Sequence, residues 1–110
     1  MATSAYILGF STSHYDAMIK FFRDFGFTVV EGSPLFEHGR AARVTREGLE
    51  FQLEESDCEG AKAVFNLCLT HCSNEEIERF KGLGYEYELG ESVGGEFHHF
   101  KSPDGGTIVT

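Results

Sequence analysis

The residues from 13 to 30 carry the most regular hydrophobic pattern in the chain and predict one amphipathic helix followed by a strand. Apolar side chains recur with helical spacing at Met18, Phe21, Phe22 and Phe25. Ser13 and Asp16 have the spacing of a capping box, which favours the start of a helix at this point. Gly26 can adopt the left-handed conformation that ends helices, and residues 27–30 are aromatic or β-branched, as in strands.

A similar pattern recurs in the second half of the chain. Ser73 and Glu76 form another capping box, and a shorter apolar stripe follows at Ile77, Phe80 and Leu83. Gly84 is expected to end this second helix, and residues 85–89 alternate between aromatic or apolar and acidic side chains, which predicts a strand. Residues 89–92 contain Gly90 and are expected to break that strand.

Further apolar runs predict strands around both helices. Alternation is clearest over residues 49–54, where one face carries Leu49, Phe51 and Leu53. The opposite face of that strand carries Glu50, Gln52 and Glu54. Other strands are predicted at residues 5–11, 35–45, 63–70, 96–101 and 107–110. Each half then has the order β-α-β-β-β, which an internal duplication explains. We expect an α+β fold in a single domain, with modules at residues 1–57 and 58–110.

The charge and composition of the chain exclude several classes of protein. Nine Lys and Arg residues against eighteen Asp and Glu residues give a net charge of −9, whereas a nucleic-acid backbone requires clustered basic side chains. No apolar run approaches the ~20 residues that a membrane span needs. The N-terminus lacks the pattern of a secretory signal, and three cysteines are an odd set for a disulfide framework. We therefore expect a cytoplasmic protein that binds neither nucleic acid nor membrane.

Two segments resemble motifs of the vicinal oxygen chelate superfamily, which includes glyoxalases, extradiol dioxygenases and bleomycin-resistance proteins. The run from Phe21 to Phe27 (FFRDFGF) resembles the end of that superfamily's first helix, and Phe100 to Ile108 (FKSPDGGTI) resembles its closing hairpin. The likeness spans nearly the whole chain. The strand at residues 65–69, the acidity and the short length look most like bleomycin-resistance proteins. The resemblance implies paired βαβββ modules whose sheets curl around a cleft.

The resemblance also implies where a metal would bind in metal-dependent members of the superfamily. Those members carry ligands on the first and last strand of each module, and these positions correspond to Ile7, Gln52, Phe65 (or Val64, if the register shifts by one) and Val109. Gln52 is the only one with a donor atom, and it is a weak ligand. We therefore expect no metal and no other cofactor, which argues against glyoxalase or dioxygenase chemistry.

Two smaller clusters contain residue types that can carry chemistry. His98 and His99 are adjacent on a predicted strand, so one of them is expected in the cleft beside Phe97. His99 is the weak candidate for a catalytic general base, although packing or ligand contact is the simpler interpretation. Zinc requires three or four convergent ligands, which is not expected of the short run that contains Cys68, His71 and Cys72.

The sequence predicts a metal-independent protein that binds and sequesters a small cationic or aromatic compound. Carboxylates concentrate cations and aromatic rings stack on them, although the acidity could also serve solubility alone. The alternatives are a metal-independent lyase or isomerase that uses the same cleft, and an interaction module. Small modules leave sheet edges and Phe side chains uncovered, so a homodimer is expected. The expected ligand-binding residues are Ile7, Glu50, Gln52, Phe65, Leu67, Phe97 and His99.

Overall fold

The computed structural model describes residues 8–32 and 39–110, and the chain divides into two compact units. The first unit is Met1–Ala63 and the second is Val64–Thr110, so the division falls later than the predicted module boundary after residue 57. Ser13 contributes to this difference, because its backbone N–H donates to the Ala61 carbonyl oxygen over 2.9 Å and its hydroxyl donates to the same oxygen over 3.1 Å. The segment that follows β4 is thereby bound to the first unit.

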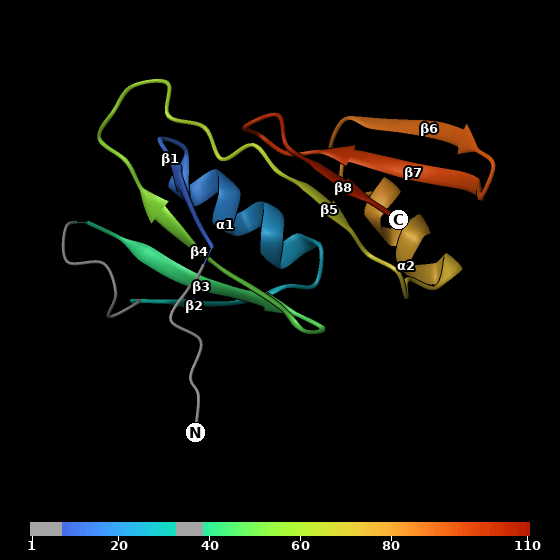
Figure 1. Cartoon of the computed structure of the whole chain (residues 1–110), viewed down its shortest axis with the longest axis horizontal. Coiled ribbons are helices and arrows are strands. Elements are labelled where there is room, and N and C mark those ends of the chain that lie inside the picture. Colours follow the sequence, from blue (N-terminus) through green and yellow to red (C-terminus); the bar gives the residue numbers. More distant parts are fainter. Residues whose placement is uncertain (1–7, 33–38) are drawn as a thin grey trace. The chain divides into compact units, whose positions relative to one another are not determined.

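The first unit is a four-stranded mixed sheet covered on one face by a helix (Figure 1). Its elements are β1 (Gly9–Thr12), α1 (Tyr15–Asp24), β2 (Thr28–Glu31), β3 (Ala41–Arg46) and β4 (Leu49–Glu55). The strands lie in the order β1-β4-β3-β2, with β1 parallel to β4 and the other pairs antiparallel. The first and last strands of the unit are therefore neighbours.

Aromatic side chains of α1 and β4 form the core of the first unit. The predicted stripe on α1 is fully buried at Met18, Phe21, Phe22 and Phe25. Phe22 packs edge-on against Phe51 of β4 with ring centroids 5.1 Å apart, and Phe10 of β1 packs against Phe51 at 5.5 Å. Leu53 is also fully buried. The alternation along β4 is thus confirmed, and its odd-numbered residues face α1.

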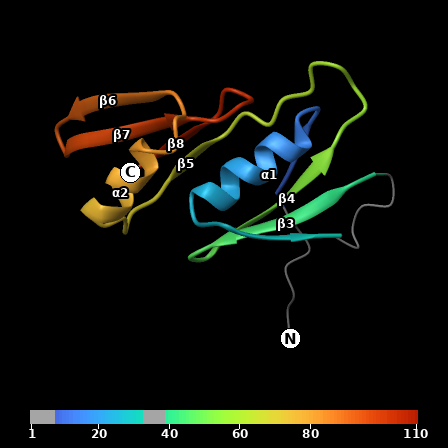
Figure 2. The ribbon, with the colours of Figure 1, turned by 180° about the vertical axis from the view of Figure 1, so that it is seen from behind.

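The second unit repeats this arrangement (Figure 2). Its elements are β5 (Asn66–Cys68), α2 (Asn74–Lys81), β6 (Tyr87–Ser92), β7 (Gly95–Lys101) and β8 (Thr107–Val109). The strand order is β5-β8-β7-β6, with β5 parallel to β8 and the other pairs antiparallel. Two βαβββ modules in an α+β fold are therefore confirmed.

The core of the second unit is smaller. Phe100 and Ile108 are fully buried, and Phe80 of α2 packs edge-on against Phe100 with ring centroids 5.9 Å apart. The loop between β7 and β8 brings Gly106 against Phe65, where an added Cβ would lie 2.8 Å from the Phe65 backbone nitrogen and 3.0 Å from its ring. A side chain at position 106 would therefore displace Phe65 from the core.

The two helices begin differently, although the sequence predicts a capping box for both. At α2 the box is present, because the Ser73 hydroxyl accepts from the Glu76 N–H and the Glu76 carboxylate accepts from the Ser73 N–H. At α1 the prediction is wrong: the N-cap residue is His14, and its side chain makes no capping hydrogen bond. The Ser13 hydroxyl is instead bound to the Ala61 carbonyl.

The strand after α2 also differs from the prediction. The sequence predicts a strand at residues 85–89 and a break at 89–92, but β6 continues to Ser92. The turn follows at Val93 and Gly94. In the sequence, Gly90 predicts the end of the strand. In the structure it lies inside β6, opposite Phe97 of β7.

The remaining elements agree with the sequence in kind but not always in length. β5 has three residues, whereas a strand over residues 63–70 is expected. Ile7 and residues 35–38 of the predicted strands lie outside the described residues. Within the described ranges, no helix is long and apolar enough to cross a membrane.

Candidate ligand-binding site

In each unit the helix covers one face of the sheet, and the opposite face carries polar side chains. Directly paired residues on neighbouring strands point to the same face, so the strand register assigns them. The face away from α1, which we call the first polar face, carries Ser11, Arg43, Glu50, Gln52 and Glu54. The face away from α2, which we call the second polar face, carries Glu88, Phe97, His99, Lys101 and Thr107.

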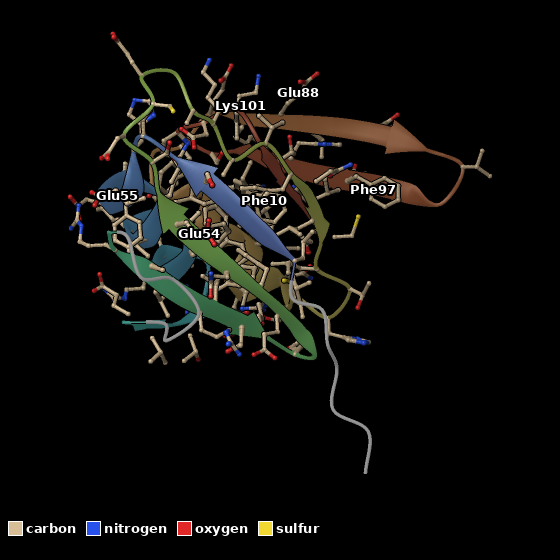
Figure 3. All side chains as sticks on the ribbon, turned by 60° about the vertical axis from the view of Figure 1, so that its left-hand side comes forward. Phe10, Glu54, Glu55, Glu88, Phe97 and Lys101 are labelled. Carbon is tan, nitrogen blue, oxygen red and sulfur yellow. The ribbon has the colours of Figure 1, made fainter. Side chains whose placement is uncertain are left out.

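Gln52 and Glu54 form the centre of the first polar face. Gln52 is only 5% exposed although it points away from α1, and its amide nitrogen Nε2 donates to Glu54 Oε1 over 2.7 Å. The other carboxylate oxygen of Glu54 accepts a hydrogen bond from the Ser11 hydroxyl over 3.4 Å. Figure 3 shows Glu54 on β4, where β1 runs beside it. Two uncharged donors thus hold this half-buried carboxylate in place.

Glu50 has a different partner. The Arg43 guanidinium of β3 donates to the Glu50 carboxylate and forms an ion pair with it. Arg43 lies opposite Gln52 in the register, so this pair crosses the sheet diagonally. Glu50 is therefore neutralised within the face, whereas the charge of Glu54 is not balanced by either of its two donors. With two carboxylates and one guanidinium, the first polar face has a net charge of −1.

A cavity of about 410 Å³ lies on the second polar face. Its lining residues are Glu86, Tyr87, Glu88, His99, Lys101 and Thr107. The Lys101 ammonium is 3.9 Å from the Glu86 carboxylate, but both side chains are exposed, so this ion pair is weak. Glu88 lies directly opposite His99 on the neighbouring strand. Glu88 and Lys101 can be followed in Figure 3. With His99 neutral, two carboxylates and one ammonium again give a net charge of −1.

The two adjacent histidines lie on opposite faces of β7, as the sequence predicts. His99 shares its face with Phe97 and lines the cavity. His98 is on the side of α2, where its Nδ1 lies 2.6 Å from the Tyr87 hydroxyl oxygen and the two rings are stacked with centroids 5.8 Å apart. His98 therefore has a structural contact, and His99 is the histidine on the cavity wall.

A second cavity, of about 530 Å³, lies where β8 ends in the second unit. Cys68, Cys72 and His98 are among its lining residues, together with Phe97. In the part of the chain that the structure describes, no group of three or more His, Cys, Asp and Glu side chains is placed to hold a metal ion. We assign no chemistry to this cavity.

The residues expected to bind a ligand are divided between several places. Glu50 and Gln52 lie on the first polar face, His99 lines the cavity on the second, and Phe97 lines the second cavity. The structure therefore joins His99 with residues that the prediction did not include, Glu86, Glu88 and Lys101. The alternation at residues 85–89 could have placed Glu88 on the polar face of a strand. That Glu88 lies opposite His99 follows only from the register of β6 and β7.

Phe65 and Leu67 have other surroundings. Leu67 pairs with Ile108, which is fully buried on the side of α2, and Phe65 lies two residues earlier and is 8% exposed. Alternation places both residues on the side of the helix rather than on the second polar face. Their contact with a ligand remains a prediction, and Ile7 lies outside the described residues.

A separate charged cluster joins the start of α1 to the end of β4. The Arg40 guanidinium donates to the Asp16 carboxylate over 2.8 and 3.1 Å and to Glu55 over 2.6 Å, and it lies 4.6 Å from the centroid of the Tyr15 ring. Hydrogen bonds from Arg40 hold the pKa values of Asp16 and Glu55 below their usual range, and the same bonds raise the pKa of Arg40. Each of the two carboxylates accepts hydrogen bonds from the Arg40 guanidinium, unlike Glu54, whose two donors are uncharged, so we do not include this cluster in the site.

Solved structures with the same fold include proteins that bind antibiotics. A bleomycin-binding protein complexed with bleomycin is 16% identical, with 97% of this chain and 96% of that chain covered and a TM-score of 0.62. TnmS3, an antibiotic-binding protein from Streptomyces sp. CB03234, is 23% identical, with 99% and 95% covered and a TM-score of 0.64.

Enzymes share the fold as well. A lactoylglutathione lyase from Agrobacterium tumefaciens is 16% identical, with 98% of this chain and 93% of that chain covered and a TM-score of 0.65. No family model matches the sequence, and no curated protein matches it. The structural likeness confirms the predicted glyoxalase/bleomycin-resistance fold.

Proposed function

We propose that this chain is a metal-independent protein that binds and sequesters a small cationic or aromatic compound on a polar face. The observation that carries the proposal is the charge of the first polar face and of the cavity on the second, each of which has two carboxylates against one cation. Two of the similar structures are antibiotic-binding proteins by name, which supports a binding role for a chain of this fold.

The local geometry favours a cation. A carboxylate above the low-dielectric interior of a sheet attracts positive charge more strongly than one surrounded by water. Glu54 is held by Gln52 and Ser11, so it loses little conformational freedom when a ligand binds. Glu88 lies opposite His99, where an aromatic ligand can contact the imidazole while its charge meets the carboxylate.

Charge-removing variants test this proposal and identify the face that binds. We would titrate naphthylmethylammonium, an aromatic cation, into the wild type, Glu88→Gln and Glu54→Gln by calorimetry. Loss of the carboxylate that meets the ligand should weaken binding by about 0.5–2 kcal/mol, the range between an exposed and a desolvated contact. The other variant should weaken binding less, since a carboxylate on the face that does not bind attracts the ligand only through the long-range electrostatic field.

Glu59→Gln is the matched control, because Glu59 is exposed in the segment after β4 and its loss changes the net charge equally. If both variants of the polar faces lose no more affinity than Glu59→Gln, the acidity serves solubility and the proposal is wrong. One ligand per chain without any change in the ligand would be the signature of sequestration.

One observation favours a second candidate function, a metal-independent lyase or isomerase. His99, Glu88 and Lys101 are proton-carrying groups on the wall of one cavity. Turnover of a candidate substrate that disappears in His99→Gln would favour this function. Stoichiometric binding without turnover in the wild type would favour sequestration.

We also propose that two chains pair as a homodimer. β2 and β6 are edge strands, and each carries an exposed aliphatic side chain: Val30 is 60% exposed and Leu89 is 47% exposed. Edge strands with exposed apolar side chains are surfaces that associate. Light scattering at about tens of micromolar should give the mass of two chains, and Leu89→Lys or Val30→Lys should shift it towards one. A monomer at that concentration would contradict the proposal.

A further inference from the structure

Gly90 lies in the interior of a strand, where its backbone conformation does not require a glycine. It is in β6, opposite Phe97 of β7. Glycine weakens the interior of a strand, and it is usually required where φ is positive. Gly90 is not among the positive-φ glycines of the chain, whereas Gly84 and Gly95 on either side of β6 are. Any residue could therefore adopt the backbone conformation at position 90.

The space beside Gly90 is occupied by His99. A Cβ added to Gly90 would lie 3.1 Å from His99 Nε2 and 3.4 Å from Cδ2, with the Phe97 carbonyl oxygen next at 3.9 Å. A contact of 3.1 Å is closer than nine in ten Cβ contacts in proteins. His99 is paired with Glu88 rather than with Gly90, so its ring leans diagonally along the sheet. The missing side chain at position 90 is what leaves room for the imidazole there.

We infer that Gly90 is a positioning residue that lets the His99 imidazole lie against β6, at the wall of the 410 Å³ cavity. The effect on binding depends on the proposed function: an aromatic cation would contact the imidazole in this orientation, beside Glu88. A Cβ at position 90 would force the imidazole away from β6 by a few tenths of an ångström, and His99 is half-buried, so it has space to move.

Gly90→Ala tests this inference because the variant should fold. The backbone conformation accepts alanine, and alanine reduces the entropy of the unfolded chain, which offsets the cost of moving the His99 ring. Gly82→Ala is the matched control in the same unit. Gly82 has φ −75° at the end of α2, and its added Cβ would make an ordinary contact of 3.4 Å with the Arg79 carbonyl oxygen.

The first readout needs no ligand. In the NMR spectrum of the free protein, the imidazole cross-peaks of His99 should shift in Gly90→Ala and stay in place in Gly82→Ala. The cross-peaks of His98, on the opposite face of β7, should move much less in both variants. If the His99 cross-peaks of Gly90→Ala match those of Gly82→Ala, Gly90 does not position the ring and the inference is overturned.

The second readout is the affinity for naphthylmethylammonium. Gly90→Ala should weaken binding about three- to tenfold, as expected for the loss of one aromatic contact, and Gly82→Ala should not. In a His99→Ala background, Gly90→Ala should not weaken binding further, because the imidazole that it would displace is absent. A loss that persists in that background would contradict the positioning role. If the wild type does not bind the probe, the proposed function fails, while the NMR comparison still decides whether Gly90 positions His99.

Discussion

The Arg46 guanidinium completes the C-terminal end of α1, because its Nη1 donates a hydrogen bond to the Phe25 carbonyl oxygen over 3.0 Å. This carbonyl belongs to the last turn of the helix, where backbone acceptors have no partner within the helix and the helix dipole favours a positive charge. Gly26 follows with φ +81°, and a Cβ there would lie 2.4 Å from the same Nη1. Glycine at position 26 is thus favoured by its conformation, whereas the Arg46 guanidinium, at the end of a flexible side chain, could move away from a Cβ.

Arg46→Met should therefore lower the free energy of unfolding by about 1–2 kcal/mol, since it removes a charged donor from a partly buried carbonyl. Urea denaturation measures this loss. Arg23→Met is the control: Arg23 lies on α1 and is 3.6 Å from Glu31 in an exposed ion pair, which should contribute less than about 1 kcal/mol. Equal losses in the two variants would show that the bond to Phe25 adds nothing beyond a surface interaction.

Phe22→Ala should be the more damaging change in the first unit. Phe22 is fully buried and contacts Phe51 and Phe27 with ring centroids 5.1 and 5.3 Å apart. Removing its ring should cost about 3–5 kcal/mol, much of the stability of a small domain. Leu8→Ala, at an exposed position just before β1, should change stability by no more than about 0.5 kcal/mol. A loss below about 1 kcal/mol for Phe22→Ala would mean that the core is not packed as described.

Stability should also fall at alkaline pH because of Tyr15. Burial, followed by the nearby Glu31 carboxylate, raises the pKa of Tyr15 from 10.0 to about 12. The unfolded chain loses this proton first, so the contribution of Tyr15 is complete below pH about 10 and is lost as the pH rises towards about 12. Tyr15→Phe should therefore show a shallower decline in the free energy of unfolding over this range.

The comparison with Tyr15→Phe is needed because Lys81 also makes the protein less stable as the pH rises. The Glu78 carboxylate raises the pKa of Lys81, so this lysine also contributes less stability as the pH rises. The difference between the wild type and Tyr15→Phe isolates the tyrosine. Parallel declines in the two proteins would show that Tyr15 titrates normally in the fold.

The sequence predicts those parts of the structure that depend on nearby residues. The buried stripe of α1 follows from helical spacing, and the capping box of Ser73 and Glu76 forms within one turn. The alternation at residues 49–54 separates the side of α1 from the first polar face. In each case the information lies within a few residues, where the periodicity of a helix or strand determines which side chains are buried.

The predictions that failed depend on distant partners. Ser13 does not cap α1 because its hydroxyl binds Ala61, 48 residues away. Gly90 does not break its strand, which stays paired with β7 as far as Ser92. The contact of Glu50 with a ligand stays a prediction, but its ion pair with Arg43 from β3 could not be predicted from the sequence. The candidate site is therefore less predictable than the core, because the pairing of strands determines which charges are neutralised.

The most direct test of the account is a calorimetric titration with three ligands that share one aromatic group and differ in charge: naphthylmethylammonium, naphthylmethanol and naphthylacetate. Each would be measured at about 0.02 M and about 0.5 M salt, on either side of the range where surface charges become screened. The account predicts that the cation binds most tightly and that its advantage over the neutral ligand decreases at high salt. Equal affinities for all three ligands, or tighter binding of the anion, would contradict the claim that the polar faces select a cation.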